Sequence, residues 1–139
     1  MKLSVKSDYA ARAVFGLARH FPKGGACRVE ALAAEQGVPA NYLLQILIEL
    51  KAQGIVRSVR GKEGGYMLAR PPGEITLADV LYAVHGTVFD SPALSDPGCP
   101  PELRRAWKKL QLSVDSAAGA ITFQSLLDES AAKEKMYYI

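Results

Sequence analysis

Between positions 39 and 53, apolar residues recur with the period of an α-helix. Pro39 suits the first helical position because its φ is fixed and it lacks a backbone donor, and Gly54 suits the helix end. One face of this predicted helix is apolar and is expected to be buried: Leu43, Ile46, Leu47 and Leu50. Asn41 and Gln45 lie on the opposite face. The sequence therefore predicts an amphipathic helix with short amides on its exposed side.

Helical spacing predicts further helices at residues 6–21, 28–36, 76–86 and 102–118. Gly119 is expected to end the last of these, and Thr122 to cap a short helix through Leu127. The final stretch, KEKMYYI, has no assignable pattern. Residues 87–101 lack periodicity and are rich in proline and glycine, so we expect an irregular loop there that is functional or mobile.

Two short apolar stretches, at residues 55–59 and 66–68, predict β-strands. The segment between them, from Arg60 to Gly65, is basic and rich in glycine, as expected for the tip of a hairpin. A short helix, a turn, a longer helix and a hairpin together make a winged helix-turn-helix. The predicted fold is therefore mainly α with a small β wing.

The segment at Pro71, Pro72 and Gly73 marks a boundary between a winged helix-turn-helix domain at 1–73 and a helical region at 74–139. Along the helix at 102–118, apolar residues spaced by three and four form a seam suited to a second helix: Leu103, Trp107, Leu110, Val114 and Ala117. Little of the chain is left to cover this seam. We therefore expect a long C-terminal dimerisation helix that pairs with a second copy.

Charge is unevenly distributed along the 139 residues, 49% of which are apolar. Residues 1–70 hold 11 Lys and Arg against 5 Asp and Glu, a balance of +6, whereas residues 71–139 hold 6 against 9, a balance of −3. The basic half contains the predicted helix-turn-helix and wing, which favours a polyanionic partner for that half. The chain has no run of about 18 apolar residues and no signal-like start, so a cytoplasmic protein without membrane contact is expected.

These features favour double-stranded DNA as the partner. Asn and Gln side chains can bond adenine bidentately in the major groove, which makes Asn41 and Gln45 candidates for reading bases. Basic groups and glycines at a hairpin tip suit a phosphate backbone or a minor groove, and hydroxyls and cations near a helix N-terminus suit phosphate. The candidates of these two kinds are Lys6, Ser7, Tyr9, Arg28, Arg60, Gly61 and Lys62.

The segments LSVKSDYAARAV, ALAAEQGVP, NYLLQILIELKAQGIV and VRGKEGGYMLARPP resemble the family of bacterial winged-helix regulators that includes IscR, NsrR and CymR. The resemblance covers nearly the whole chain, and its most specific part is the strand, wing and strand. It implies a homodimer with two recognition helices in successive major grooves and two wings in flanking minor grooves. Carried over by position, the DNA-binding residues would be Pro39, Asn41, Tyr42, Gln45, Arg60 and Gly61. Leu44 stands where the iron-sulfur regulator of this family has an acidic residue.

Cluster-binding members of that family carry three cysteines in the loop before the dimer helix, whereas this chain has only Cys99 there. One cysteine cannot supply the usual ligand set, so we expect no cofactor and no metal. An iron-sulfur cluster with non-cysteine ligands is the alternative, in which Cys99, Asp8 and a histidine such as His85 meet across a dimer. Cys99 is also a possible redox thiol, on the expectation that a loop cysteine is exposed. Otherwise Cys99 is a thiol without a role.

Three classes of function remain to be compared. The sequence has no GxSxG, phosphate loop, metal quartet or paired Cys and His motif, so no enzymatic activity is expected. A winged-helix module that binds protein and not DNA is the alternative, and its support is Leu44 and Ile48, apolar residues beside the reading face. The sequence leaves open whether these two pack on a neighbouring helix or touch a thymine methyl. The basic half favours a sequence-specific DNA-binding regulator, a dimeric repressor with the helix 39–53 in the major groove and the wing 60–65 in the minor groove.

Overall fold

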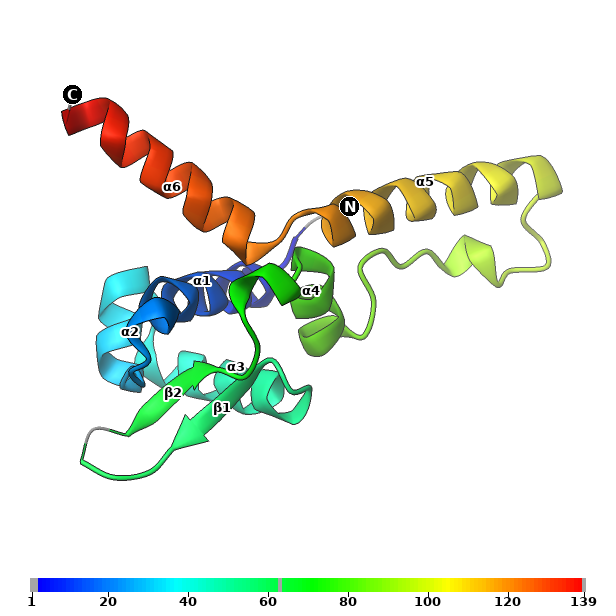
Figure 1. Cartoon of the computed structure of the whole chain (residues 1–139). Coiled ribbons are helices and arrows are strands. Elements are labelled where there is room, and N and C mark those ends of the chain that lie inside the picture. The colour runs from blue at the N-terminus through cyan, green and yellow to red at the C-terminus, as the bar shows by residue number, and fades with distance from the viewer. Residues whose placement is uncertain (1–2, 63, 139) are drawn as a thin grey trace.

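The computed structural model describes residues 3–62 and 64–138 and shows a helical protein with one small sheet (Figure 1). Its helices are α1 (Val5–His20), α2 (Val29–Gln36), α3 (Ala40–Ala52), α4 (Leu77–His85), α5 (Pro101–Ala120) and α6 (Phe123–Tyr138). Its strands are β1 (Val56–Val59) and β2 (Gly65–Leu68), and single 3₁₀ turns occur at Phe21–Lys23, Pro72–Glu74 and Pro92–Leu94. The predicted class, mainly α with a β wing, is confirmed.

The two strands form an antiparallel hairpin in which Val56 pairs with Leu68 and Val59 with Gly65. The segment before α2 extends this sheet, because Cys27 and Tyr66 exchange two backbone hydrogen bonds of 2.8 Å. Gly65 has a φ of +155°, and a Cβ there would overlap the backbone of Cys27. The absence of a side chain at this position therefore lets the base of the hairpin join the segment that leads into α2.

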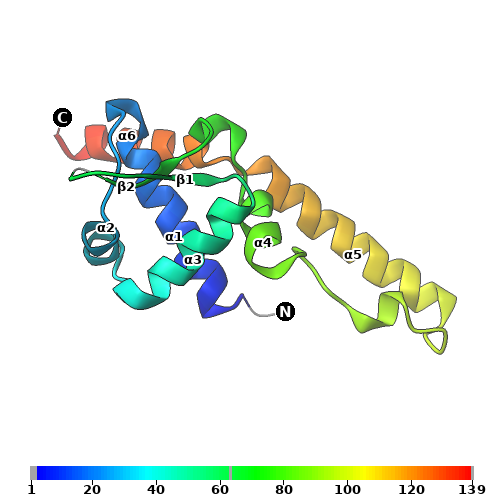
Figure 2. The same ribbon diagram turned by 90° about the horizontal axis from the view of Figure 1, so that it is seen from below.

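Most of the buried apolar residues among those described form one hydrophobic core, where α1 passes between α3 and α6 (Figure 2). The small residues Ala10 and Ala13 of α1 are fully buried, and α1 packs against both α3 and α6. The core also includes residues from beyond the predicted boundary at 73, namely Ile75, Val80 and Phe123. Phe123 is 0% exposed. The winged helix and the start of α6 are thus held together by the same buried side chains.

The C-terminal part differs from the sequence-based expectation. Gly119 does not end α5, which continues to Ala120, and α6 runs through Tyr138 instead of stopping near Leu127. Nothing lies near Gly119, so the helix passes through it at the modest cost of about 1 kcal/mol for an exposed helical glycine. Residues 131–136 of α6 are exposed, so their helical conformation depends on helix propensity and not on burial. Because they have no apolar period, the sequence pattern did not predict a helix there.

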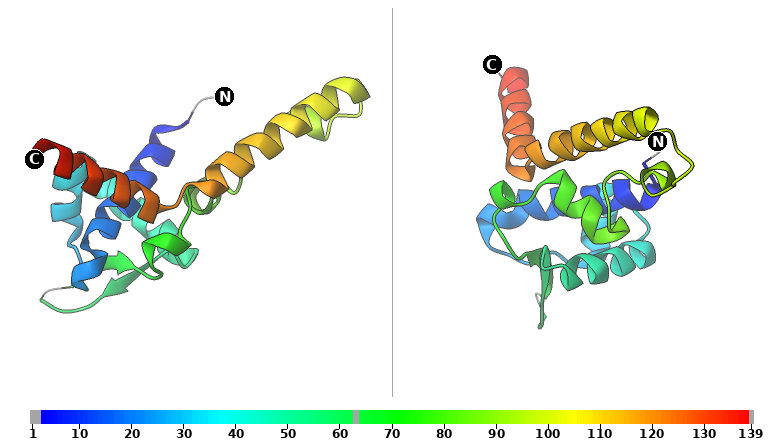
Figure 3. Two further views of the ribbon diagram at one scale, coloured as in Figure 1. Left: turned by 45° about the horizontal axis from the view of Figure 1, so that its top comes forward. Right: turned by 90° about the vertical axis from the view of Figure 1, so that its right-hand side faces the viewer.

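Helix α5 and residues 86–100 project from the body as an arm: the loop runs outward to the tip, where α5 begins, and α5 leads back to the body (Figures 1 and 3). Side chains of the arm hold this loop by its backbone: Arg104 donates to the carbonyl of Cys99 at 3.2 Å, and Gln111 donates to that of Phe89 at 3.4 Å. Phe89 and Cys99 are buried. The loop is irregular, as expected, but it is packed against α5.

We expect Phe123→Ala to lower the free energy of unfolding by about 3–5 kcal/mol, because it empties a fully buried site in the core, where α6 packs against α1. Urea unfolding followed by circular dichroism measures this. Met136→Ala, which truncates a side chain of α6 that is 82% exposed, is the control and should change stability little. Equal effects of the two substitutions would contradict a core role for Phe123.

Candidate nucleic-acid interface

The buried and exposed faces of α3 follow the predicted pattern. Leu43, Ile46, Leu47 and Leu50 are buried, and Asn41 and Gln45 are exposed on the opposite face. Leu44 and Ile48 are 39% and 48% exposed. The helix therefore presents two amides and two branched aliphatic side chains to the outside of the protein.

Helix α3 starts one residue later than predicted, because Pro39 was expected to be its first residue. Pro39 is the N-cap, with φ −58° and ψ 130°, and its carbonyl accepts the backbone bond from Leu43 at 2.9 Å. The turn before it depends on Gly37, which ends α2 with a φ of +66° that favours glycine. Pro39 is exposed and lies immediately before the outward residues of α3.

Two tyrosines connect the starts of α1 and α3. The rings of Tyr9 and Tyr42 meet edge to face, with 5.6 Å between centroids and an interplanar angle of 82°. Tyr42 remains 41% exposed, while Tyr9 is half-buried. Such a contact restricts both rings, so Tyr42 is held in one orientation beside the outward face of α3.

Arg12 is a residue at this surface that sequence reasoning missed. Its guanidinium pairs with Asp8 at 2.8 Å, donates to the carbonyl of Gln36 at 3.3 Å and lies 5.6 Å from the centre of the Tyr9 ring. The Gln36 carbonyl is one of the last of α2, which has no partner within its own helix. Arg12 thus fixes the turn between α2 and α3 to α1. The spacing of Asp8 and Arg12 by four residues was the available sequence signal.

The first turn of α1 is less open than expected. Lys6 forms an ion pair of 2.9 Å with Glu49 of α3. Ser7, a predicted phosphate contact, is only 3% exposed, and its hydroxyl lies 3.1 Å from that of Ser4, the N-cap of α1. Ser7 therefore fits a structural role inside the turn and not the predicted phosphate contact.

The hairpin tip presents exposed cations. Arg60, Gly61 and Lys62 are exposed, and Gly61 has a φ of +116°, which favours glycine. The guanidinium of Arg28 donates to the carbonyl of Lys62, so this predicted phosphate contact also supports the hairpin. Arg57 of β1 is a further exposed cation next to the tip, and sequence reasoning did not single it out.

The two cysteines do not resemble reactive thiols. Cys99, which we expected to be exposed, is 8% exposed because the N-terminal part of α5 and the loop enclose it, and its Sγ contacts the carbonyl of Pro100. Burial raises the pKa of the Cys27 thiol, and the nearby Glu35 carboxylate raises it further. A raised pKa lowers the thiolate fraction and hence the reactivity of Cys27 at neutral pH.

Within one chain, the described residues that were considered as ligands of a metal or cluster lie apart or have other partners. Among residues 3–62 and 64–138, no group of three or more His, Cys, Asp and Glu side chains could hold a metal ion. Asp8 is engaged by Arg12 at 2.8 Å, and His85 Nε2 lies 2.7 Å from the hydroxyl of Ser4. With Cys99 buried elsewhere, these side chains do not fit an iron-sulfur cluster in the single chain.

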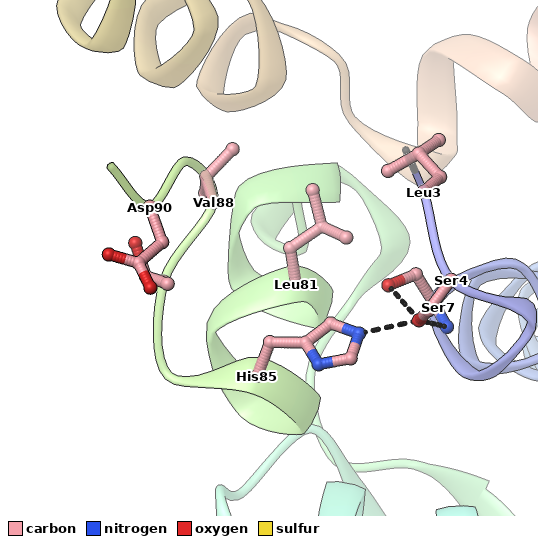
Figure 4. A pocket seen from close by; sticks show the side chains of 8 residues that line it. Leu3, Ser4, Ser7, Leu81, His85, Val88 and Asp90 are labelled. Carbon is pink, nitrogen blue, oxygen red and sulfur yellow. Dashed lines mark hydrogen bonds between the residues drawn. The ribbon is translucent and has the colours of Figure 1, made fainter. Parts of the chain in front are cut away.

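A cavity of about 430 Å³ lies between the first turn of α1, α4 and the start of the loop (Figure 4). The contact between His85 and Ser4 spans one side of it, and Leu81 and Asp90 contribute to its lining. At this cavity, α4 and the loop after it lie next to the first turn of α1, which carries Lys6.

The predicted seam of α5 is largely uncovered by the described residues. Of all residues in α5, Ala118 alone is buried. Within the seam, Leu103 and Leu110 are 45% and 44% exposed, Ala117 is exposed, and Trp107 and Val114 are half-buried. No helix in the part of the chain that the structure describes has the length and hydropathy to cross a bilayer.

Comparison with known proteins identifies relatives over nearly the whole chain. Residues 3–129 match the Rrf2 family, described as an iron-dependent transcriptional regulator. A protein of Mycobacterium tuberculosis strain CDC 1551, named as a candidate HTH-type transcriptional regulator, is 40% identical over 121 residues, which cover 84% of this chain and 74% of the relative. The HTH-type transcriptional regulator IscR of Xenorhabdus nematophila is 32% identical over 131 residues, covering 91% of this chain and 79% of the relative.

Solved structures show the same similarity. The structure of T. potens IscR has a TM-score of 0.79 at 31% identity and covers 94% of this chain and 88% of its own. That of CymR, the global cysteine regulator of B. subtilis, has a TM-score of 0.83 at 26% identity and covers 93% and 98%. The relatives from M. tuberculosis and X. nematophila are named as HTH-type transcriptional regulators, and CymR as a global cysteine regulator.

From the contacts of Arg12 we predict that it positions α3 without contacting DNA itself. Arg12→Gln should lower affinity for an operator obtained by in vitro selection several-fold, while the slope of log affinity against log salt stays the same, because no phosphate contact is lost. Fluorescence anisotropy across a salt series measures both quantities. Arg19→Gln, which removes a charge from an exposed site in the last turn of α1, is the matched control. A slope reduced by about one in Arg12→Gln would show instead that Arg12 contacts a phosphate.

Proposed function

The chain belongs to the Rrf2 family of transcriptional regulators, and from this premise we propose that it represses transcription as a homodimer bound to a specific DNA site. It is a DNA-binding regulator of the helix-turn-helix type. In the proposed complex, α3 enters the major groove and the hairpin tip at 60–65 contacts the adjacent minor groove.

The observation that carries this proposal is the common orientation of the two candidate elements. Helix α3 and the hairpin lie on one side of the body, and α5 and α6 lie on the other (Figures 1 and 3). The outward face of α3 carries Asn41 and Gln45, whose amides can donate to N7 and accept from N6 of adenine. The N-terminal part of a recognition helix is the part that usually reaches the bases.

The hairpin supports the electrostatic part of binding. Arg60 and Lys62 are exposed at its tip, and Arg28 holds the Lys62 carbonyl, which limits the freedom of the tip before DNA arrives. Cations at such a tip can release counterions from phosphates, and an arginine can enter a narrow minor groove. This contact would add affinity, whereas the amides of α3 would add sequence preference.

Dimerisation is supported by the exposed seam of α5. An α5 of 20 residues is about 30 Å long, sufficient for two such arms to pack along each other. Burying Leu103 and Leu110 against a second copy would remove apolar surface that one chain leaves in water. A pair of modules related by two-fold symmetry would present two α3 helices to successive major grooves.

Two substitutions separate the proposed roles of the wing and of α3. Arg60→Ala should weaken binding to specific and random DNA alike and reduce the salt slope by about one per subunit. Gln45→Ala should cost about 1–3 kcal/mol on the selected operator and leave binding to random DNA nearly unchanged. Anisotropy titrations of both DNAs at several salt concentrations measure this, with Lys133→Ala on α6 as the charge control. Wild-type binding by both variants would contradict the two assignments.

The dimer is tested by a charge in the centre of the seam. Leu110→Glu should shift the protein from dimer to monomer in sedimentation velocity, because carboxylates in an apolar helix pair are costly to bury. Specific DNA affinity should fall with it, since only one half-site is then bound at a time. Ser113→Glu, an exposed site of α5 outside the seam, should remain dimeric. A Leu110→Glu variant that stays dimeric would place the interface elsewhere.

A further inference from the structure

Branched aliphatic side chains share the outward face of α3 with its amides. Asn41, Leu44, Gln45 and Ile48 are spaced as a single stripe on a helix of 3.6 residues per turn. Leu44 and Ile48 are 39% and 48% exposed, so these two side chains do not occupy the core formed by the described residues. The structure therefore gives no support, among the described residues, to the alternative that these two side chains pack into the core. Ile48 lies within the outward face and not on its flank.

We propose, on the basis of the DNA binding proposed above, that Leu44 and Ile48 contact the C5-methyl groups of thymines in the major groove. That methyl is the distinctive apolar group a base pair offers there, and it distinguishes T·A from C·G. Such a contact removes the apolar surface of the side chain and that of the methyl group from water, which stabilises the complex without a charge or a hydrogen bond. The operator is therefore rich in A·T pairs where it faces α3.

The neighbouring side chains support the same base preference. Asn41 and Gln45 match the adenine edge, and each A·T pair displays that edge beside the thymine methyl. The charged residues next to the stripe are held by other groups: Glu49 pairs with Lys6 at 2.9 Å, and the Lys51 amine donates to the hydroxyl of Ser58 at 2.8 Å. The stripe itself carries no arginine or lysine, the side chains that most often read guanine.

The helix geometry gives the spacing of the thymines. Leu44 and Ile48 are four residues apart and thus about 6 Å apart along the axis of α3. Base pairs are stacked about 3.4 Å apart, so a helix lying along the groove places the two side chains about two base-pair steps from each other. Leu44 is closer to the N-terminus of α3, the end that reaches deepest into the groove in helix-turn-helix proteins.

Replacing thymine by deoxyuridine tests this proposal, because it deletes only the methyl group and keeps every hydrogen-bonding atom. The probe is the operator obtained by in vitro selection with the full-length protein, with each thymine of the half-site replaced in turn. For the wild type, we expect two positions about two steps apart at which affinity falls about fourfold per methyl lost. Leu44→Ala should lose the sensitivity at one position and Ile48→Ala at the other, as in a double-mutant cycle.

Met136→Ala, an exposed apolar truncation far along α6, is the matched control and should keep the wild-type pattern. Uniform insensitivity of the wild type to deoxyuridine would overturn the proposal. So would Leu44→Ala and Ile48→Ala variants that keep the full wild-type pattern, a result that leaves the two side chains to a protein partner. Selection that yields no preferred sequence would instead contradict the proposed function itself. Binding of a selected operator without methyl dependence would leave that function standing.

Discussion

The packing of α3 against α1 determines where every proposed base contact lies. The apolar face of α3 is fully buried in the core that it shares with α1. Successive residues of a helix are about 100° apart around its axis. If the buried face of α3 were shifted by one residue, the helix would be rotated by that angle, and Asn41 and Gln45 would point away from the groove. The leucines and isoleucine that fill the core therefore also set the orientation of the amides, and core substitutions would alter DNA recognition without touching DNA.

Polar contacts refine the position that the core sets. Arg12 fixes the turn before α3 through the Gln36 carbonyl, and Lys6 fixes the C-terminal part of α3 through Glu49. Both cations come from α1, so the reading helix is held to one element at two points along its length. The partners remain partly exposed, which makes each contact worth little stability, but together they restrict rotation and tilt of α3.

Much of this arrangement could be predicted from the sequence because it depends on local signals. The period of the leucines and the glycine and proline punctuation predicted α3, and the Arg60–Gly65 segment predicted the hairpin. The rest depended on tertiary context. Neither the burial of Ser7 nor that of Cys99 follows from its neighbours in sequence, and α6 extends beyond residue 127 without an apolar period. Pro39 caps α3 instead of starting it, a difference of the size that helix boundaries commonly show.

The distribution of charge separates affinity from specificity. Lys6 and Arg12 add nothing to the balance of +6 over residues 1–70, because the carboxylates that they face, Glu49 and Asp8, are already counted in it. The outward stripe of α3 is uncharged, whereas Arg60 and Lys62 are exposed at the hairpin. Phosphate contacts weaken steeply with salt, and contacts to base edges and methyl groups do so much less. The hairpin would then control how tightly the protein holds any DNA, and α3 would control which DNA it prefers. The two properties could therefore change independently.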